Sequence, residues 1–111
     1  MEKLYRIYNT NTKEFMDNSG DLLVDVNTGN VYAGDLRRND TTINITSYTE
    51  LNQYLGKDTL NQSVYVGDIV DVSAETYPSI RKEMYSHEDW FEANINGESV
   101  IKVGNVYGIK E

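Results

Sequence analysis

The sequence predicts a mainly β protein, a small β-barrel or sandwich with a short central helix. Val and Ile together number 18 against 10 for Leu and Ala, and there are nine Tyr and nine Thr. Such β-branched and aromatic side chains lose rotamer freedom in helices and suit a pleated surface. Twelve Asn and eight Gly supply tight turns, including turns that need a positive φ. Many short strands joined by such turns form small sandwiches and barrels.

Residues 1–46 are predicted to form an N-terminal lobe of β-hairpins. Residues 3–8 are a short apolar and aromatic run, followed by the polar turn at 9–12. The chain resumes with Glu14, Phe15 and Met16, which fits the return arm of a hairpin.

A second hairpin follows in the same lobe. Residues 22–26 and 31–33 are its arms, and Gly29 occupies the loop position that favours a left-handed backbone. The polar stretch 36–42 indicates an exposed loop, and a brief strand is predicted at 43–45, where isoleucines alternate with a polar residue.

Residues 47–60 are predicted to form a short helix and a connector. Ser47 and Glu50 have the spacing of a capping box, in which each side chain satisfies a backbone N–H at the start of a helix. Gly56 is a natural helix end. Three large side chains between these signals lie at helical spacing: Leu51, Tyr54 and Leu55.

Residues 61–111 are predicted to form a second β lobe, and the whole chain one compact domain. Two strands, 64–66 and 69–72, are separated by Gly67 and Asp68. We interpret this pair as a turn, with Gly for backbone freedom and Asp for a side-chain bond to nearby N–H groups.

The segment 78–92 fits both a helix and a strand. Pro78 can open a helix, and one helical face would hold Ile80, Met84, His87 and Phe91. A strand interpretation competes, because apolar residues alternate up to Asn96 and Gly97, the strongest hairpin signal in the chain. We expect a helix over 78–86, hairpin arms near 90–95 and 98–103, and a last strand over 105–109.

Three stretches, in order, resemble the YopX family of phage and prophage proteins. The first is an aromatic-Arg strand, Leu4–Tyr8, followed by Thr12–Met16. The second is Gln53–Asp58 followed by Val64–Val70, which is similar to the family's Gly-Leu-Lys-Asp turn and Ile-Tyr-Glu-Gly-Asp-Ile-Val strand. The third is Val103–Tyr107, which is similar to a closing Ile-Gly-Asn-Ile-Tyr strand.

The resemblance implies a phage or prophage origin and a mostly β fold. It implies that the second half is a small SH3-like barrel opened by the segment from Gly67 to Val70. The family brings no established enzymatic activity to this chain, so the resemblance sharpens the fold and leaves the function open.

The residue types argue against an enzyme, a cofactor or a metal site. The chain has no Cys and a single His, His87, so thiol catalysis, Cys–zinc sites and most nucleophilic triads have no basis. A lone His beside Glu88 and Asp89 supplies too few converging ligands for a metal. No glycine cluster has the spacing of a phosphate-binding loop.

The charge argues against direct nucleic-acid binding, and the hydropathy against a membrane span. The net charge is −8, whereas phosphate backbones attract clustered Lys and Arg; Arg37 and Arg38 are the one basic pair in a polar loop. No apolar run approaches the roughly 20 residues of a membrane helix, and residues 1–10 have no signal-peptide core. We expect a cytoplasmic protein of a host bacterial cell.

The acidic residues are concentrated in the second half. Between residues 68 and 98 there are eight acids against Arg81 and Lys82, which is −6 of the total −8. Such a face is either an ordinary solvated surface or a surface complementary to a basic partner. The candidate contact residues for the second interpretation are Glu83, Glu88, Asp89, Trp90 and Glu92.

The predicted function is that of a non-catalytic phage accessory protein that binds a bacterial protein or complex with a basic surface. A stoichiometric inhibitor of a host defence or nucleic-acid-processing complex, such as an anti-CRISPR or anti-restriction protein, has this character. The alternative is a homo-oligomeric structural or small-ligand-binding module that assembles through its β surfaces.

Overall fold

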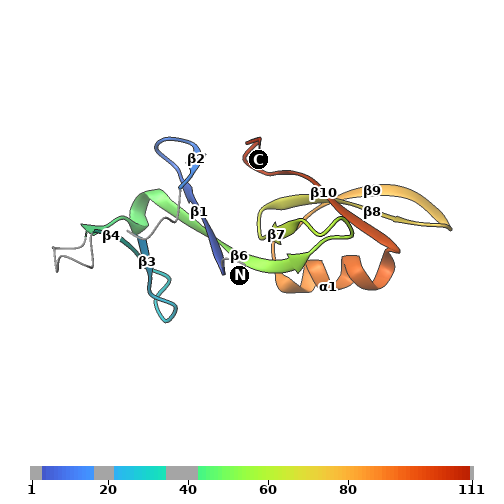
Figure 1. Ribbon diagram of the computed structural model, residues 1–111, viewed down its shortest axis with the longest axis horizontal. Helices are drawn as coiled ribbons and strands as arrows, with labels where there is room; N and C mark the ends of the chain where they lie inside the picture. The colour runs from blue at the N-terminus through green and yellow to red at the C-terminus, as the bar shows by residue number, and fades with distance from the viewer. Residues whose placement is uncertain (1–3, 17–21, 35–42, 111) are drawn as a thin grey trace. The chain divides into compact units, whose positions relative to one another are not determined.

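The computed structural model describes residues 4–16, 22–34 and 43–110 (Figure 1). The chain divides into two compact units. Met1–Tyr5 and Asn52–Glu111 form what we call the C-terminal unit, and Arg6–Leu51 forms the N-terminal unit. The chain therefore changes unit between Tyr5 and Arg6 and again between Leu51 and Asn52. The described residues are mainly β with a single α-helix, which confirms the predicted fold class.

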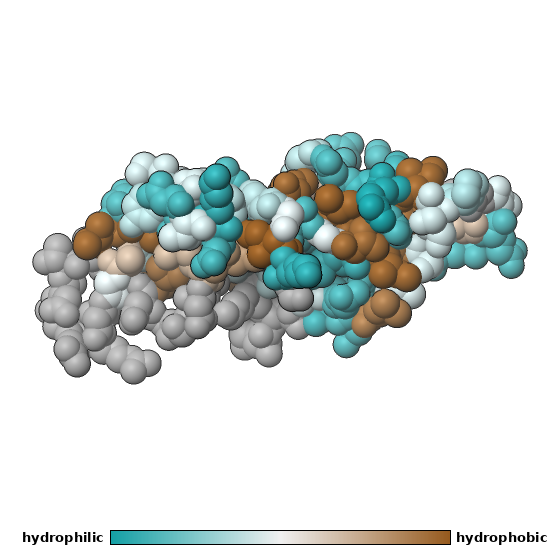
Figure 2. All heavy atoms as spheres, turned by 90° about the horizontal axis from the view of Figure 1, so that it is seen from above, coloured by the Kyte–Doolittle hydropathy of each residue, from teal (hydrophilic) through white to brown (hydrophobic). Residues whose placement is uncertain are grey.

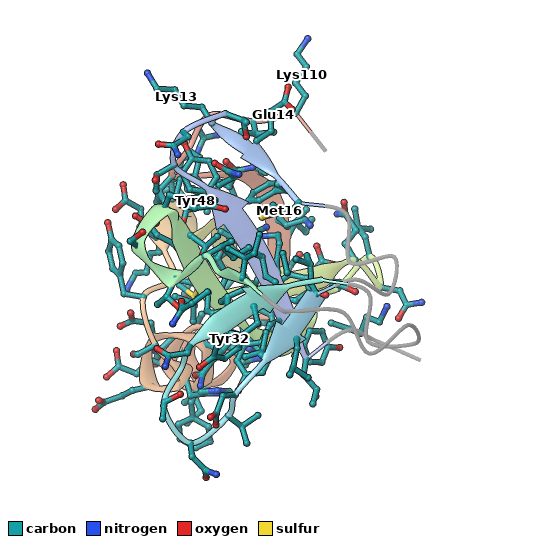
Figure 3. The ribbon with its side chains drawn as sticks, turned by 90° about the vertical axis from the view of Figure 1, so that its left-hand side faces the viewer. Lys13, Glu14, Met16, Tyr32, Tyr48 and Lys110 are labelled. Carbon is teal, nitrogen blue, oxygen red and sulfur yellow. The ribbon has the colours of Figure 1, made fainter. Side chains whose placement is uncertain are left out.

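The first hairpin of the N-terminal unit is the predicted one. Strand β1 (Tyr5–Asn9) pairs antiparallel with β2 (Glu14–Phe15). The Asn9 side-chain oxygen accepts the backbone N–H groups of Asn11 and Thr12 at 2.9 and 3.1 Å. These side-chain bonds add to the backbone bond from the Lys13 N–H to the Asn9 carbonyl at 2.8 Å. Figure 3 labels Lys13 and Glu14 at this tip.

The second predicted hairpin is also present. Strands β3 (Leu22–Val24), β4 (Val31–Ala33) and β5 (Ile43–Asn44) form an antiparallel sheet in that order. Gly29 has the expected positive φ of 76°. The predicted loop 36–42, with Arg37 and Arg38, lies outside the described residues. The core of this unit is Ile7, Val31 and Ile45, against which partly buried apolar side chains pack, including Met16 and Tyr48 (Figure 3).

The predicted helix after Ser47 is wrong. A single 3-10 turn, η2 (Thr46–Tyr48), leads into the nine-residue strand β6 (Thr49–Lys57). Strand β6 lies between β1 and β7 (Ser63–Tyr65) in the order β2-β1-β6-β7. A helix of two turns is only marginally stable by itself. As a strand, the same residues pair with both β1 and β7, and the local sequence pattern does not reveal these two partners.

The turn between β7 and β8 (Asp68–Ala74) is built as predicted. Gly67 has a φ of 95°, which a side chain would strain. The Asp68 carboxylate is fully buried and accepts the Tyr65 N–H at 2.8 Å. The β7-to-β8 connection is thus fixed by one backbone conformation and one buried side chain.

The segment after β8 differs from the expectation. Residues predicted as a helix over 78–86 form strand β9 (Tyr77–Glu83), and residues predicted as a strand near 90–95 lie in helix α1 (His87–Asn96). Ile80 and Met84 are four residues apart, a spacing that places side chains on one face of a strand as well as of a helix. Strand β9 has this spacing: its register places Ile80 opposite Val72, and Met84 follows directly after its last residue.

The Asn96–Gly97 hairpin is also wrong, because Asn96 ends α1 and Gly97 caps it. The Gly97 N–H donates to the Ala93 carbonyl at 3.0 Å, and its φ is −103°. A Cβ at Gly97 would lie 2.5 Å from Val72 Cγ1. Glycine is therefore required here by close packing and not by a turn.

Strand β10 (Ser99–Asn105) confirms the arm predicted near 98–103, but not a strand over 105–109. The chain turns at Asn105, whose side-chain oxygen accepts the N–H groups of Tyr107 and Ile109, both at 3.1 Å. Strands β10, β8 and β9 form an antiparallel sheet in that order.

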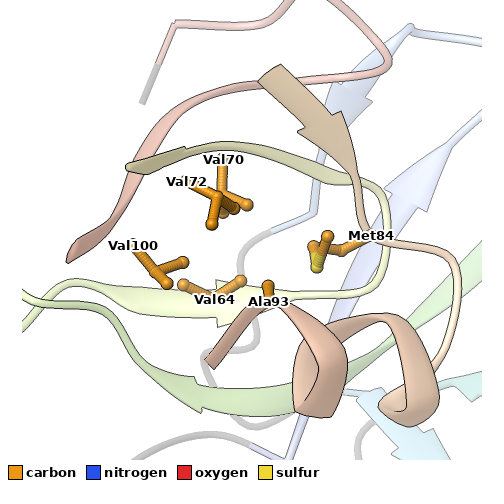
Figure 4. Packing of buried hydrophobic residues seen from close by; sticks show 6 residues of the cluster. All are labelled: Val64, Val70, Val72, Met84, Ala93 and Val100. Carbon is orange, nitrogen blue, oxygen red and sulfur yellow. The ribbon is translucent and has the colours of Figure 1, made fainter. Parts of the chain in front are cut away.

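The core of the C-terminal unit lies between this sheet and α1 (Figure 4). Helix α1 contacts β8 and β10, and Trp90 and Leu55 pack at the edge of the cluster. Among the described residues, no helix has the length and apolar character needed to cross a membrane. The buried members of this core are Val64, Val70, Val72, Met84, Ala93 and Val100.

Candidate interaction surface on helix α1

Helix α1 starts at a reciprocal cap. The Ser86 hydroxyl oxygen accepts the Asp89 N–H at 3.2 Å, and the Asp89 carboxylate accepts the Tyr85 N–H at 2.9 Å. The Ser86 side chain thus satisfies a backbone donor that the first helical turn leaves open, and the Asp89 side chain satisfies one just before the helix. The Ser-x-x-Asp spacing of this cap is visible in the sequence, although the prediction placed a helix over 78–86 and a strand near 90–95.

The inward face of α1 carries Ala93 and Trp90. Ala93 is buried in the core, and Trp90 packs against the same cluster. The Trp90 ring also lies on Gly56, where an added Cβ would be 2.9 Å from the indole Nε1. The indole is therefore part of the contact between α1 and β6, and not a side chain projecting into solvent.

The outward face of α1 carries two large apolar side chains beside two carboxylates. Phe91 and Ile95 are 66% and 65% exposed, and a separation of four residues places them next to each other on the helix. Glu88 and Glu92 are exposed and lie on the same face, also four residues apart. We call these four residues the α1 outer face.

Helix stability explains only part of this arrangement. Glu88, in the first turn, interacts favourably with the helix dipole. Glu92 is past that turn, and a like-charge pair four residues apart costs a few tenths of a kcal/mol. The helix sequence contains no Lys or Arg to offset the pair. The exposed Phe91 and Ile95 add nothing to the core of this unit.

The structure separates the five predicted contact residues into two groups. Glu88 and Glu92 lie on the α1 outer face, and Glu83 is exposed at the end of β9, where its carboxylate accepts a hydrogen bond from the Tyr85 hydroxyl. Asp89 and Trp90 instead hold α1 in place, through the N-terminal cap and the core. The predicted turn residues divide in the same way, since Gly67 and Asp68 form a turn whereas Asn96 and Gly97 end a helix.

Sequence reasoning missed Phe91, Ile95 and Tyr85, which are all more than 60% exposed. The missed signal is the helical period of residues 87–96. With Trp90 and Ala93 inward, that period directs Phe91 and Ile95 outward. Figure 2 shows further apolar side chains at the surface of the C-terminal unit, interspersed with polar ones.

The pocket near residue 110 gives less support for a functional site. A pocket of about 490 Å³ near the chain end is lined partly by Lys102 and Lys110. The Lys102 ammonium already donates to the Ser63 carbonyl at 2.8 Å. In the described part of the chain, no three metal-ligating side chains gather.

Comparison with protein-family models, with curated proteins and with solved structures gives no match to this chain.

Proposed function

We propose that the protein is a non-catalytic phage or prophage accessory protein that binds a bacterial protein with a basic surface through the α1 outer face. The observation that carries the proposal is an exposed Phe91–Ile95 pair flanked by Glu88 and Glu92 on a helix without Lys or Arg. A stoichiometric inhibitor of a host defence or nucleic-acid-processing complex fits this surface. The phage origin is what the resemblance to the YopX family implies.

The charges and the apolar pair would serve different steps of binding. Carboxylates facing a basic surface raise the association rate and make it salt-dependent. A central aromatic residue that becomes desolvated sets the dissociation rate. The partner should therefore present Lys or Arg around an apolar hollow large enough for a phenyl ring.

Neutralising the two carboxylates is expected to slow association about tenfold at low salt and to flatten its salt dependence. The variant is Glu88→Gln with Glu92→Gln; Asp89 is left unchanged because its carboxylate caps the helix. The partner is first captured from bacterial lysate at low salt, and the kinetics are then measured by surface plasmon resonance. The matched control, Glu75→Gln with Glu98→Gln, removes the same charge from two exposed positions outside α1.

Truncating the aromatic residue should instead act on dissociation. Phe91→Ala is expected to raise the dissociation rate roughly 30-fold, the equivalent of about 2 kcal/mol for an interface anchor. Its circular dichroism spectrum should match that of the parent protein, because the side chain is 66% exposed. Folded Phe91 and Glu88/Glu92 variants that bind with the parent kinetics would refute the α1 outer face as the binding surface.

A further inference from the structure

A pocket of about 290 Å³ opens between helix α1 and strand β9 in the C-terminal unit. Residues two apart in a strand share a face, and residues three apart in a helix do so as well. One face of β9 and one face of α1 therefore form its walls. The lining residues are Val72 from β8, Ile80 and Lys82 from β9, and Ala93 and Asn96 from α1.

The pocket is open because α1 covers only part of the sheet. The helix contacts β8 and β10, and its end approaches β8 so closely that a Cβ at Gly97 would lie 2.5 Å from Val72 Cγ1. Val72 and Ala93 lie on the facing sides of the core (Figure 4). Ile80 lies opposite Val72 in the register of β9, so it points to the side of α1, yet it is left 47% exposed. Apolar surface therefore remains open to solvent beside the helix.

Lys82 gives this apolar pocket a positive charge. It lies opposite the core residue Val70, so its side chain starts on the α1 side of the sheet. The neighbouring Arg81 lies opposite Asp71 on the other face, where their side chains form an ion pair at 3.1 Å. Within the described ranges, the Lys82 side chain forms no hydrogen bond or ion pair. Because a lysine stem lies along apolar surface while its ammonium reaches water, we expect a cation at the mouth of the pocket.

We propose that this pocket binds a small carboxylate with an apolar body, such as a medium-chain fatty acid or an arylpropionate. The body lies against Val72, Ile80 and Ala93, and the carboxylate meets the Lys82 ammonium, with the Asn96 side chain as a second polar group. Apolar pockets with a few convergent polar groups are the usual form of a small-molecule site. An apolar cavity of about 150 Å³ holds benzene, so this pocket has room for about ten non-hydrogen atoms.

The local charge selects an anion over other apolar molecules. A neutral molecule would gain nothing from Lys82, and a cation would be repelled by it. Glu92, one helical turn before Asn96, does not line the pocket, so its carboxylate is not part of the wall that the ligand touches. The inference does not rest on the proposed function, since no residue of the α1 outer face lines the pocket.

The test is a titration of the full chain with octanoate and with 3-phenylpropionate, followed by two-dimensional NMR of the backbone amides. We expect a dissociation constant of about 1 mM or below, the order for about ten well-packed ligand atoms. The relative affinity of the two probes distinguishes an alkyl ligand from an aryl one. The largest shifts should occur at Ile80, Lys82, Ala93 and Asn96. If neither probe saturates at millimolar concentration, or if the shifts centre elsewhere, the proposal is overturned.

Two variants separate the charge from the apolar wall. Lys82→Gln is expected to weaken octanoate binding about fivefold, the scale of one exposed charge pair, and to leave 1-octanol binding within about twofold. Ile80→Ser should weaken both ligands about tenfold, because it removes apolar contact area. The matched control Arg81→Gln removes the same charge from the opposite face of β9 and should bind octanoate like the parent protein. All three side chains are exposed, so each variant should keep the parent fold. A folded Lys82→Gln with the parent affinity for octanoate, or an equal loss in Arg81→Gln, overturns the proposal.

Discussion

Replacing Trp90 by Ala is expected to lower the free energy of unfolding by about 3 kcal/mol. The indole packs on the core cluster and on Gly56, and truncating a core aromatic residue removes buried area and leaves a cavity. Urea denaturation followed by circular dichroism measures the loss. The neighbouring control is Phe91→Ala, which is expected within about 0.5 kcal/mol of the parent because its side chain is exposed. If the two variants were equally stable, Trp90 would not be a core residue, and its predicted role as a contact residue for a partner would stand.

The same contact can be tested from the β6 side. Gly56 has a φ of 155°, and a methyl group there would lie 2.9 Å from the indole Nε1. Gly56→Ala should therefore destabilise the protein, and part of the loss should disappear in a Trp90→Phe background, where that nitrogen is absent. A double-mutant cycle separates the clash from the backbone strain. Strictly additive losses would show that the contact contributes nothing.

The parts of the fold that local chemistry determines were predictable. The two N-terminal hairpins follow from polar turn residues between apolar runs, and Gly67 and Asp68 act as their residue types suggest. The mainly β class follows from composition. In each case the decisive interaction joins residues that are close in the sequence.

The errors occur where distant residues decide. Strand β6 has helical spacing and a cap signal, but one of its two pairing partners, β1, lies far away in the chain. Residues 91–95 alternate like a strand, yet the Ser86 cap and the packing of Ala93 against the sheet make them helical. Gly97 was interpreted as a turn residue, whereas it is needed for contact with Val72. None of these partners can be identified from local spacing.

The candidate surface was predictable as a region and not as a set of residues. Acid clustering between residues 68 and 98 drew attention to the segment that holds α1. It could not separate Glu88 and Glu92, which face outward, from Asp89, which caps the helix. That distinction depends on where the helix begins. If the predicted start of the helix is shifted by one residue, each side chain is assigned a direction about 100° away around the helix axis.

Replacing Asp58 by Ala is expected to cost about 3 kcal/mol of unfolding free energy. The carboxylate is only 7% exposed, and it accepts the backbone N–H groups of Leu60 and Gln62 at 3.0 and 2.7 Å and that of Lys102 at 2.8 Å. It also accepts the Gln62 side-chain amide at 3.0 Å. Truncation leaves several donors without an acceptor, each a penalty comparable to a lost hydrogen bond.

The conservative variant Asp58→Asn should show about half of that loss. Its amide oxygen can still accept from one pair of donors, but its NH₂ group then faces the other pair. The control Glu98→Ala removes an exposed carboxylate and should stay within about 0.5 kcal/mol of the parent protein. Chemical denaturation gives the energies, and amide exchange at Lys102 shows whether the segment 58–62 has separated from β10. If Asp58→Ala melts like the control and the Lys102 amide stays protected, the carboxylate does not hold that edge of the sheet.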